Sequence, residues 1–94
     1  METHIVTFTI NNDFSEWSKN FDNSLELQKQ SGINTLYRGV STEDKSKCVA
    51  IMQASSGVLE DFVKNNQKMI SESGHVVEST IKKRMSPRKL YLRT

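Results

Sequence analysis

Few side chains in this sequence could act as a nucleophile, a general base or a metal ligand. Cys48 is the single cysteine, and His4 and His75 are the two histidines. A thiolate beside an imidazole can form an activated nucleophile, whereas a protein zinc site needs three or four converging ligands. The sequence therefore predicts no metal site. A small, buried apolar residue is the usual role of a lone cysteine.

Arg38 is the most informative polar residue, because it lies beside Tyr37 within a run of strand-forming residues. A guanidinium group stays charged and binds carboxylates or phosphates through paired hydrogen bonds. We therefore take Arg38 and Tyr37 as candidate contacts for a ligand with an anionic group. The alternative is a salt bridge from Arg38 to an acidic residue on a neighbouring strand or in a partner subunit.

Three further residues are candidate ligand contacts. Gln53 and Asn66 are uncharged hydrogen-bonding residues within otherwise apolar patterns, and Trp17 lies on a predicted helix face. A buried Asn66 needs a hydrogen-bond partner, and the backbone is the alternative to a ligand. Trp17 either packs in the core or lines a pocket for a flat ligand. The sequence contains no nucleotide-binding loop, catalytic triad or flavin motif, so no cofactor is expected.

Length and composition limit the class of protein. The 94 residues carry 13 basic and 11 acidic side chains, and 35% of the residues are hydrophobic. A chain of this length forms one domain, and it contains no apolar run long enough to span a membrane. The lone cysteine and the lack of a basic-then-apolar leader favour a reducing compartment, so a cytoplasmic protein is expected.

Hydrophobic alternation and β-branched residues predict four strands. They are expected at residues 3–10, 33–40, 47–54 and 75–84. On the first strand, Val6, Phe8 and Ile10 share one apolar face, which we assign to the core. The second and third strands are joined by a polar turn and form a hairpin whose register is left open.

Two helices are predicted between these strands. The first runs over residues 13–30 with Asp13 as its N-cap, and the second lies between Gly57 and Gly74. The core-facing side of the first helix is predicted to be Phe14, Trp17, Phe21 and Leu25, and that of the second to be Leu59, Phe62, Val63, Asn66, Met69 and Ile70. We expect a shared core of Phe8, Trp17, Phe21, Phe62 and Ile70.

The order β-α-β-β-α-β predicts an α+β domain of the ferredoxin-like type over residues 1–84. Right-handed crossovers give an antiparallel sheet of strand order 4-1-3-2, with both helices on one face. In such a sheet His4 and His75 lie at opposite ends. The first strand separates Cys48 from His75 by about 9–10 Å, so a nucleophile–base pair is not expected.

The sheet face away from the helices also carries apolar residues. On the first strand this face consists of Ile5, Thr7 and Thr9. It is too apolar for full exposure to water and too polar for a dry core. We therefore expect a second copy of the chain to cover it.

Four segments of the sequence resemble a small uncharacterised cyanobacterial family and the wider dimeric α+β barrel superfamily. They are Phe14-Ser15-Glu16-Trp17, Tyr37-Arg38-Gly39-Val40-Ser41, Met52-Gln53-Ala54, and Phe62-Val63 with Asn66. The superfamily includes antibiotic-biosynthesis monooxygenases, haem-degrading enzymes and stress-responsive proteins. The resemblance covers residues 4–84 and implies a homodimer whose two sheets pack face to face. It implies a ligand inside this barrel or between sheet and helices, but no particular catalytic residue.

The end of the chain, residues 85–94, is expected to be a basic tail. Six basic residues and no acidic ones follow residue 81, whereas residues 1–81 hold seven basic and eleven acidic ones. A basic end can bind nucleic acid. RNA-recognition modules of this topology, however, stack bases on aromatic residues of strands 1 and 3. Here the third strand has no aromatic residue and Phe8 is assigned to the core, so nucleic acid is not an expected partner.

These observations predict a homodimer that binds a small, partly apolar molecule in the barrel or in a sheet–helix pocket. Cofactor-free, monooxygenase-like activity stays open. The alternatives are a non-enzymatic regulatory or stress-related dimer and, less favoured, RNA binding through the basic tail.

Overall fold

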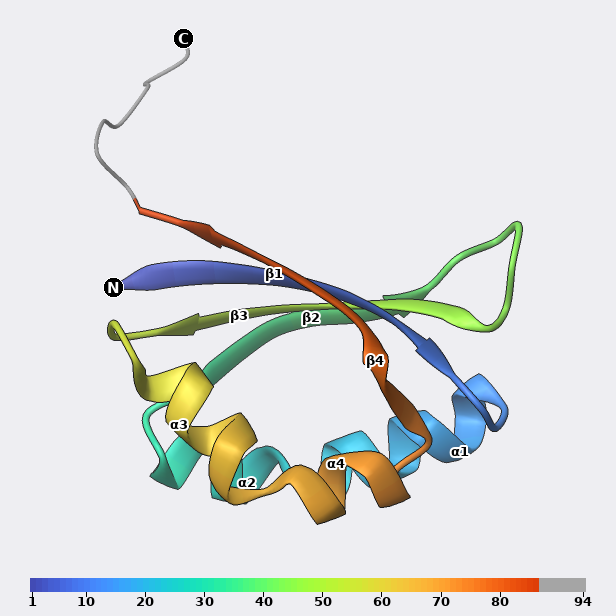
Figure 1. The fold of residues 1–94 in the computed structure, drawn as a ribbon, viewed down its shortest axis with the longest axis horizontal. Helices are drawn as coiled ribbons and strands as arrows, with labels where there is room; N and C mark the ends of the chain where they lie inside the picture. The colour runs from blue at the N-terminus through green and yellow to red at the C-terminus, as the bar shows by residue number, and fades with distance from the viewer. Residues whose placement is uncertain (87–94) are drawn as a thin grey trace, which may run out of the picture.

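The computed structural model describes residues 1–86, in which helices cover one face of a four-stranded sheet and leave the other face uncovered (Figure 1). The element order is β1-α1-α2-β2-β3-α3-α4-β4. This is the predicted ferredoxin-like α+β fold, with each predicted helix divided in two. Within the described residues, no helix is both long and apolar enough to cross a membrane. Residues 87–94, most of the predicted tail, lie outside the described part.

The sheet has the order β2-β3-β1-β4, with every neighbouring pair antiparallel, which confirms the predicted order. Its strands are β1 (Glu2–Ile10), β2 (Asn34–Val40), β3 (Lys47–Ala54) and β4 (His75–Met85). One row of opposed residues crosses all four strands: Arg38, Ala50, Val6 and Lys82. Because Val6 and Ala50 are buried in the core, this row identifies the helix-facing side of the sheet.

The helices are α1 (Phe14–Asn23), α2 (Leu25–Gln30), α3 (Val58–Asn65) and α4 (Gln67–Glu72). The predicted N-cap is confirmed, because an Asp13 carboxylate oxygen accepts a hydrogen bond from the Glu16 amide at 2.8 Å. The unbroken helix predicted over residues 13–30 is wrong, because the chain breaks at Ser24. There the Ser24 hydroxyl donates to the Phe21 carbonyl at 2.6 Å. Such side-chain bonds to nearby carbonyls compete with continued helix formation.

The second helix breaks in the same way at Asn66, whose side-chain amide donates to the Phe62 carbonyl at 2.8 Å. The backbone of Asn66 (φ −130°, ψ 28°) lies outside the helical region. Asn66 therefore bonds to the backbone, the alternative considered from the sequence. The break at Ser24 also turns Leu25 away from the core, so the prediction that Leu25 is core-facing is wrong, and Leu25 is exposed.

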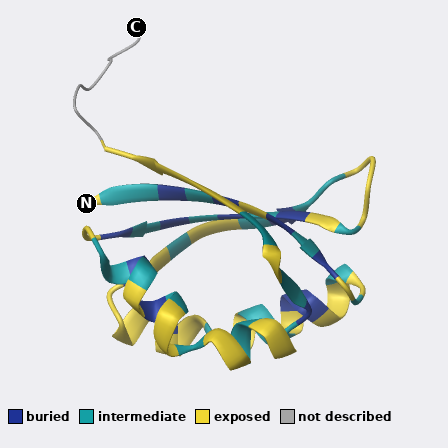
Figure 2. Ribbon diagram, viewed as in Figure 1, coloured by how far each residue is buried: buried dark blue, intermediate teal, exposed yellow. Residues whose placement is uncertain are grey.

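The core lies between the sheet and the helices, as the dark positions along β1 and β3 show in Figure 2. Phe8, Trp17 and Phe62 are buried there as predicted. Phe21 and Ile70 are only half-buried. Two residues expected to fill the core are thus partly open to solvent.

Candidate functional site

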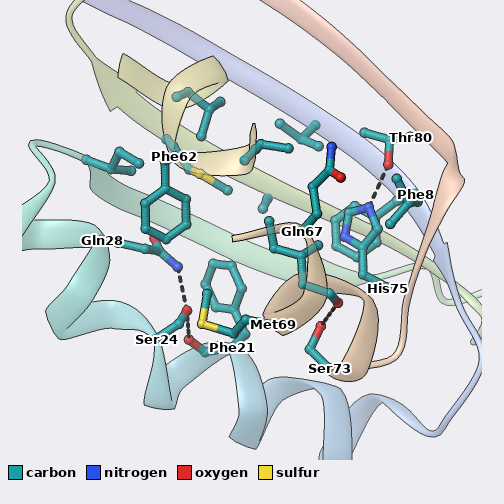
Figure 3. Close-up of a pocket in the computed structure, with 18 of the residues that line it drawn as sticks. Phe8, Phe21, Ser24, Gln28, Phe62, Gln67, Met69, Ser73, His75 and Thr80 are labelled. Carbon is teal, nitrogen blue, oxygen red and sulfur yellow. Dashed lines mark hydrogen bonds between the residues drawn. The ribbon is translucent and has the colours of Figure 1, made fainter. Parts of the chain in front are cut away.

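A cavity of about 340 Å³ lies between the helix-facing side of the sheet and the helices (Figure 3). Its strand side includes Val6, Phe8 and Ala50, and its helix side includes Trp17 and Phe62. These side chains make most of the wall apolar. Volumes of 300 Å³ or more and a mainly apolar lining with a few polar groups are typical of small-molecule sites.

The cavity follows from small side chains on β3 and loose packing of α4. At the centre of the helix-facing row, β3 contributes only the methyl group of Ala50. Within Gln67–Glu72, the whole of α4, no residue is fully buried. Met69 and Ile70, on that helix, line the cavity and stay half-buried. The helix layer therefore does not close down on the sheet at this point.

His75 forms one end of the cavity. Its imidazole ring stacks on Phe8, with ring centroids 4.1 Å apart, and Nε2 lies 2.6 Å from the Thr80 hydroxyl (Figure 3). Burial lowers the pKa of His75 to about 4, because the charged imidazolium is poorly solvated there. The ring is therefore neutral at physiological pH and can accept or donate a single hydrogen bond at each nitrogen.

Gln28 is a second polar group in the wall, and its side chain is almost fully buried, with 4% of its surface exposed. Its amide nitrogen donates to the Ser24 hydroxyl at 2.8 Å, and its amide oxygen accepts from Thr35 at 2.6 Å. The helix break at Ser24 is what supplies this partner. Gln28 is thus held in a fixed orientation by α2 and β2.

The mouth of the cavity lies between the start of α4 and β4. Three lining residues are exposed, and they are Gln67, Val77 and Lys82. Figure 3 shows the Gln67 side chain extending from its helix toward the strands. Two of these three, Gln67 and Lys82, are polar, so the mouth carries polar groups while most of the wall is apolar.

Among the residues singled out from the sequence, Trp17 lines this cavity. It is 1% exposed and contacts Phe8, Phe14 and Phe21 through ring centroids 4.8–5.8 Å apart. Trp17 thus belongs to the core and also lies in the wall of the cavity.

Arg38 lies on the helix-facing side of β2, but it is not among the residues that line the cavity. Its Nε and Nη2 atoms donate to the two carboxylate oxygens of Asp22 at 2.8 and 2.7 Å, and Nη1 donates to the Ser18 hydroxyl at 3.2 Å. The hydrogen bonds from Arg38 lower the pKa of Asp22 below its ordinary value. Arg38 therefore connects β2 to α1, with its partner on a helix and not on a strand.

Tyr37 and Gln53 lie on the uncovered face of the sheet, opposed in the ladder to Ile51 and Thr3 respectively. Tyr37 is 56% exposed and lines a shallow hollow there with Thr7 and Ile81. Asn66 lines a separate, polar groove between α1 and the α3–α4 pair. The structure thus brings Trp17 alone of the five candidates into the sheet–helix cavity.

The sequence reasoning missed Gln28, Gln67 and the position of His75 in the cavity. Gln28 continues the spacing of Trp17 and Phe21 along the first helix, so a polar residue on an apolar face was the available signal. Its burial depends on the break at Ser24. The sequence correctly places His4 and His75 at opposite ends of the sheet. In the ladder between β1 and β4, His4 is opposed to Arg84 and His75 to Ile10.

Cys48 is buried on β3, and burial raises the pKa of its thiol. Its ladder partner is Phe8 on β1, while His75 is opposed to Ile10 on the far side of that strand. The predicted separation of Cys48 and His75 by the first strand is confirmed. Among the described residues, no group of three or more His, Cys, Asp or Glu residues could hold a metal ion.

Comparisons with solved structures show the same fold. Protein Atu4242 from Agrobacterium tumefaciens is 18% identical, with 95% of each chain covered and a TM-score of 0.61. A monooxygenase from the gene ActVA-Orf6 of Streptomyces coelicolor, in complex with the ligand nanaomycin D, is 16% identical. The match covers 99% of this chain and 92% of that chain, with a TM-score of 0.61.

No curated protein matches this sequence. The model of a family described as a domain of unknown function, DUF3764, matches residues 1–86. The chain therefore belongs to the DUF3764 family.

Proposed function

We propose that this protein binds a small, mostly apolar molecule in the cavity between sheet and helices, and that it does so as a homodimer. The observation that carries the proposal is the cavity of about 340 Å³ with an apolar wall and polar groups at its edges. A ligand complex of the S. coelicolor monooxygenase, which shares this fold, supports a small-molecule role.

The wall favours a flat, ring-containing molecule. Trp17, Phe21 and Phe62 line the cavity, and the half-buried Phe21 leaves more of its ring open than the other two. Aromatic rings stack on one another at centroid distances of about 4.5–7 Å. At one end of the cavity Nε2 of the neutral His75 imidazole is engaged by Thr80, which leaves Nδ1 for a hydroxyl or carbonyl group of the ligand. The molecule is thus held by apolar contacts and oriented by a few hydrogen bonds.

The neutral dye N-phenylnaphthylamine is expected to bind in this cavity and to become fluorescent. Trp17 is the only tryptophan, and it lines the cavity, so the bound dye should quench Trp17 emission by energy transfer. Filling the floor by Ala50→Leu should weaken binding by about five- to a hundredfold, since steric overlap with the added side chain costs about 1–3 kcal/mol. Titrations followed by both fluorescence signals measure this.

Ala50→Ser is the matched control, because it changes the same position without filling the cavity. It should bind the dye almost as well as the wild-type protein, and thermal melts show which variants are folded. Equal dye binding by a folded Ala50→Leu variant would place the dye elsewhere and contradict the proposal.

A second copy of the chain is the proposed cover for the uncovered face of the sheet. Apolar side chains gather there: Ile5, Val49 and Ile51 are half-buried, while Tyr37, Ile81 and Met85 are exposed. An apolar patch of this kind on a monomer is typical of a protein interface. Two antiparallel sheets can bury such faces against each other at about 10 Å separation.

Sedimentation at micromolar concentration is expected to give twice the mass of the chain, and Ile81→Glu should shift the protein to the monomer. Ile81 is 60% exposed, so a charge there costs little in the free chain but much inside an apolar interface. Leu25→Glu, at an exposed position on the helix layer, is the control and should stay dimeric. A monomeric wild-type protein would refute this part of the proposal.

A further inference from the structure

The charges around the cavity are unbalanced. Of its lining residues, Lys82 is the one charged side chain, and within the described part of the chain no carboxylate lines the cavity. His75 is the other titratable lining group, and it is neutral at physiological pH. The electrostatic environment at the mouth is therefore set by a single ammonium group.

The other cations on the helix-facing side of the sheet have acidic partners. Arg38, at the far end of the row that contains Lys82, pairs with Asp22 at 2.7 Å. Arg84, two residues along β4, lies 3.5 Å from Glu60. Among residues 1–86, Lys82 makes no salt bridge within 4 Å.

Most polar side chains of the wall are already engaged. Those with a hydrogen-bond partner within the protein are Asn20, Ser24, Gln28, Ser73, His75 and Thr80. In the part of the chain that the structure describes, Gln67 and Lys82 have none through their side chains. Both of these residues lie at the exposed mouth, one from α4 and one from β4. Two sets of N–H donors are thus available on opposite sides of one opening.

We infer that the ligand of this cavity is an amphiphilic organic acid, whose apolar body fills the cavity and whose acidic group is bound at the mouth by Lys82 and Gln67. This inference rests on the proposed small-molecule site and adds the chemical class of its occupant. The acidic oxygens accept hydrogen bonds from the Lys82 ammonium group and the Gln67 amide. The apolar body contacts Phe21 and Phe62.

The arrangement suits an acid better than a neutral or cationic molecule. An acid at the mouth keeps part of its hydration and gains a charge-assisted hydrogen bond, which is stronger than a neutral one. A cation at the same place would be repelled by Lys82 and would find no carboxylate among the described lining residues. The interaction does not require an ion to be buried in the apolar interior, where the loss of solvation would be costly.

Two dyes with the same ring system test the inference. Anilinonaphthalene sulfonate carries an acidic group, and N-phenylnaphthylamine is the same skeleton without it. The wild-type protein is expected to bind the sulfonate about tenfold more tightly, as estimated for one hydrogen bond to a charged group. In Lys82→Gln this preference should fall to less than about twofold, while the affinity for the neutral dye stays unchanged. Added salt should weaken the binding of the sulfonate alone.

Lys64→Gln is the matched control, because it removes the same charge from an exposed position on α3 that does not line the cavity. It should keep the preference for the sulfonate. Weakened binding of both dyes in Ala50→Leu identifies the cavity as their site, and a thermal melt identifies folded variants. Equal affinities of the wild-type protein for the two dyes, or a preference that survives Lys82→Gln, would overturn the inference and leave the proposed cavity intact. Failure of both dyes to bind the wild-type protein would overturn the proposed function as well.

Discussion

Trp17→Ala is expected to lower the free energy of unfolding by about 3–5 kcal/mol, a large part of the stability of a small domain. Trp17 is 1% exposed, and its indole contacts three phenylalanine rings. Its removal loses these contacts and enlarges a cavity that already exists beside it, so the surrounding side chains cannot collapse onto the gap. Urea denaturation followed by far-ultraviolet circular dichroism measures the loss.

Phe21→Ala is the comparison, because Phe21 lies one helical turn further along the same face of α1. Phe21 is only half-buried, so its loss should cost about 1–2 kcal/mol, less than full burial implies. If Phe21→Ala destabilised the protein more than Trp17→Ala, the orientation of α1 against the sheet would be wrong.

Stability is expected to fall as the pH is lowered from about 6.5 toward 4, through the titration of His75. Burial lowers the pKa of His75 from 6.5 to about 4, so between these values the unfolded chain binds more protons than the folded one. Stability therefore rises with pH in this window. The contribution of His75 to stability is complete above pH 6.5 and is lost as the pH falls toward 4. At about 1.4 kcal/mol per pKa unit the shift corresponds to at most about 3 kcal/mol, and solvent around the half-buried ring reduces the effect to about 1–2 kcal/mol.

His75→Gln is the control for this prediction, because glutamine does not titrate and can still bond to Thr80. The variant should show a shallower loss of stability between pH 6.5 and 4 than the wild-type protein, in urea denaturation at each pH. The salt bridge between Asp22 and Arg38 adds a separate loss of stability at lower pH. The pKa of Asp22 is lowered from 3.8 in the folded protein, so its carboxylate is protonated only below that pH. Parallel curves for wild type and His75→Gln would show that His75 is not buried as the structure places it.

The strands and the topology of this protein could be predicted from the sequence because they follow from local patterns. Alternation along residues 47–54 predicts a strand with the bounds that β3 has. The apolar face of β1 and the cap at Asp13 depend only on residues that are two or three positions apart in the sequence. Right-handed crossovers and two helices between strands then allow few arrangements of the sheet.

The pairing of β2 with β3 determines which residues of β2 face the helices, and no local sequence pattern specifies this pairing. A register shift between Thr35 and Tyr37 lets Arg38 face α1 while Tyr37 faces away from the helices. Because a shift of one residue exchanges the two faces of a strand, the sequence left both orientations of Arg38 open. The salt bridge to Asp22, 16 residues away in the chain, belongs to that register.

The sequence by itself determined which side of each helix and strand is apolar. The tertiary structure alone decided where these apolar sides do not pack together and leave a cavity. The helix breaks at Ser24 and Asn66 depend on side-chain bonds to carbonyls that compete with a continued helix. The cavity exists because the small Ala50 on β3 lies beneath helices that these breaks divide. Hydrophobic periodicity predicts the buried face of one helix or strand at a time, whereas the size of a cavity depends on side chains from distant parts of the chain. For that physical reason Trp17 could be singled out from the sequence, while its place beside His75, Gln67 and Lys82 could not.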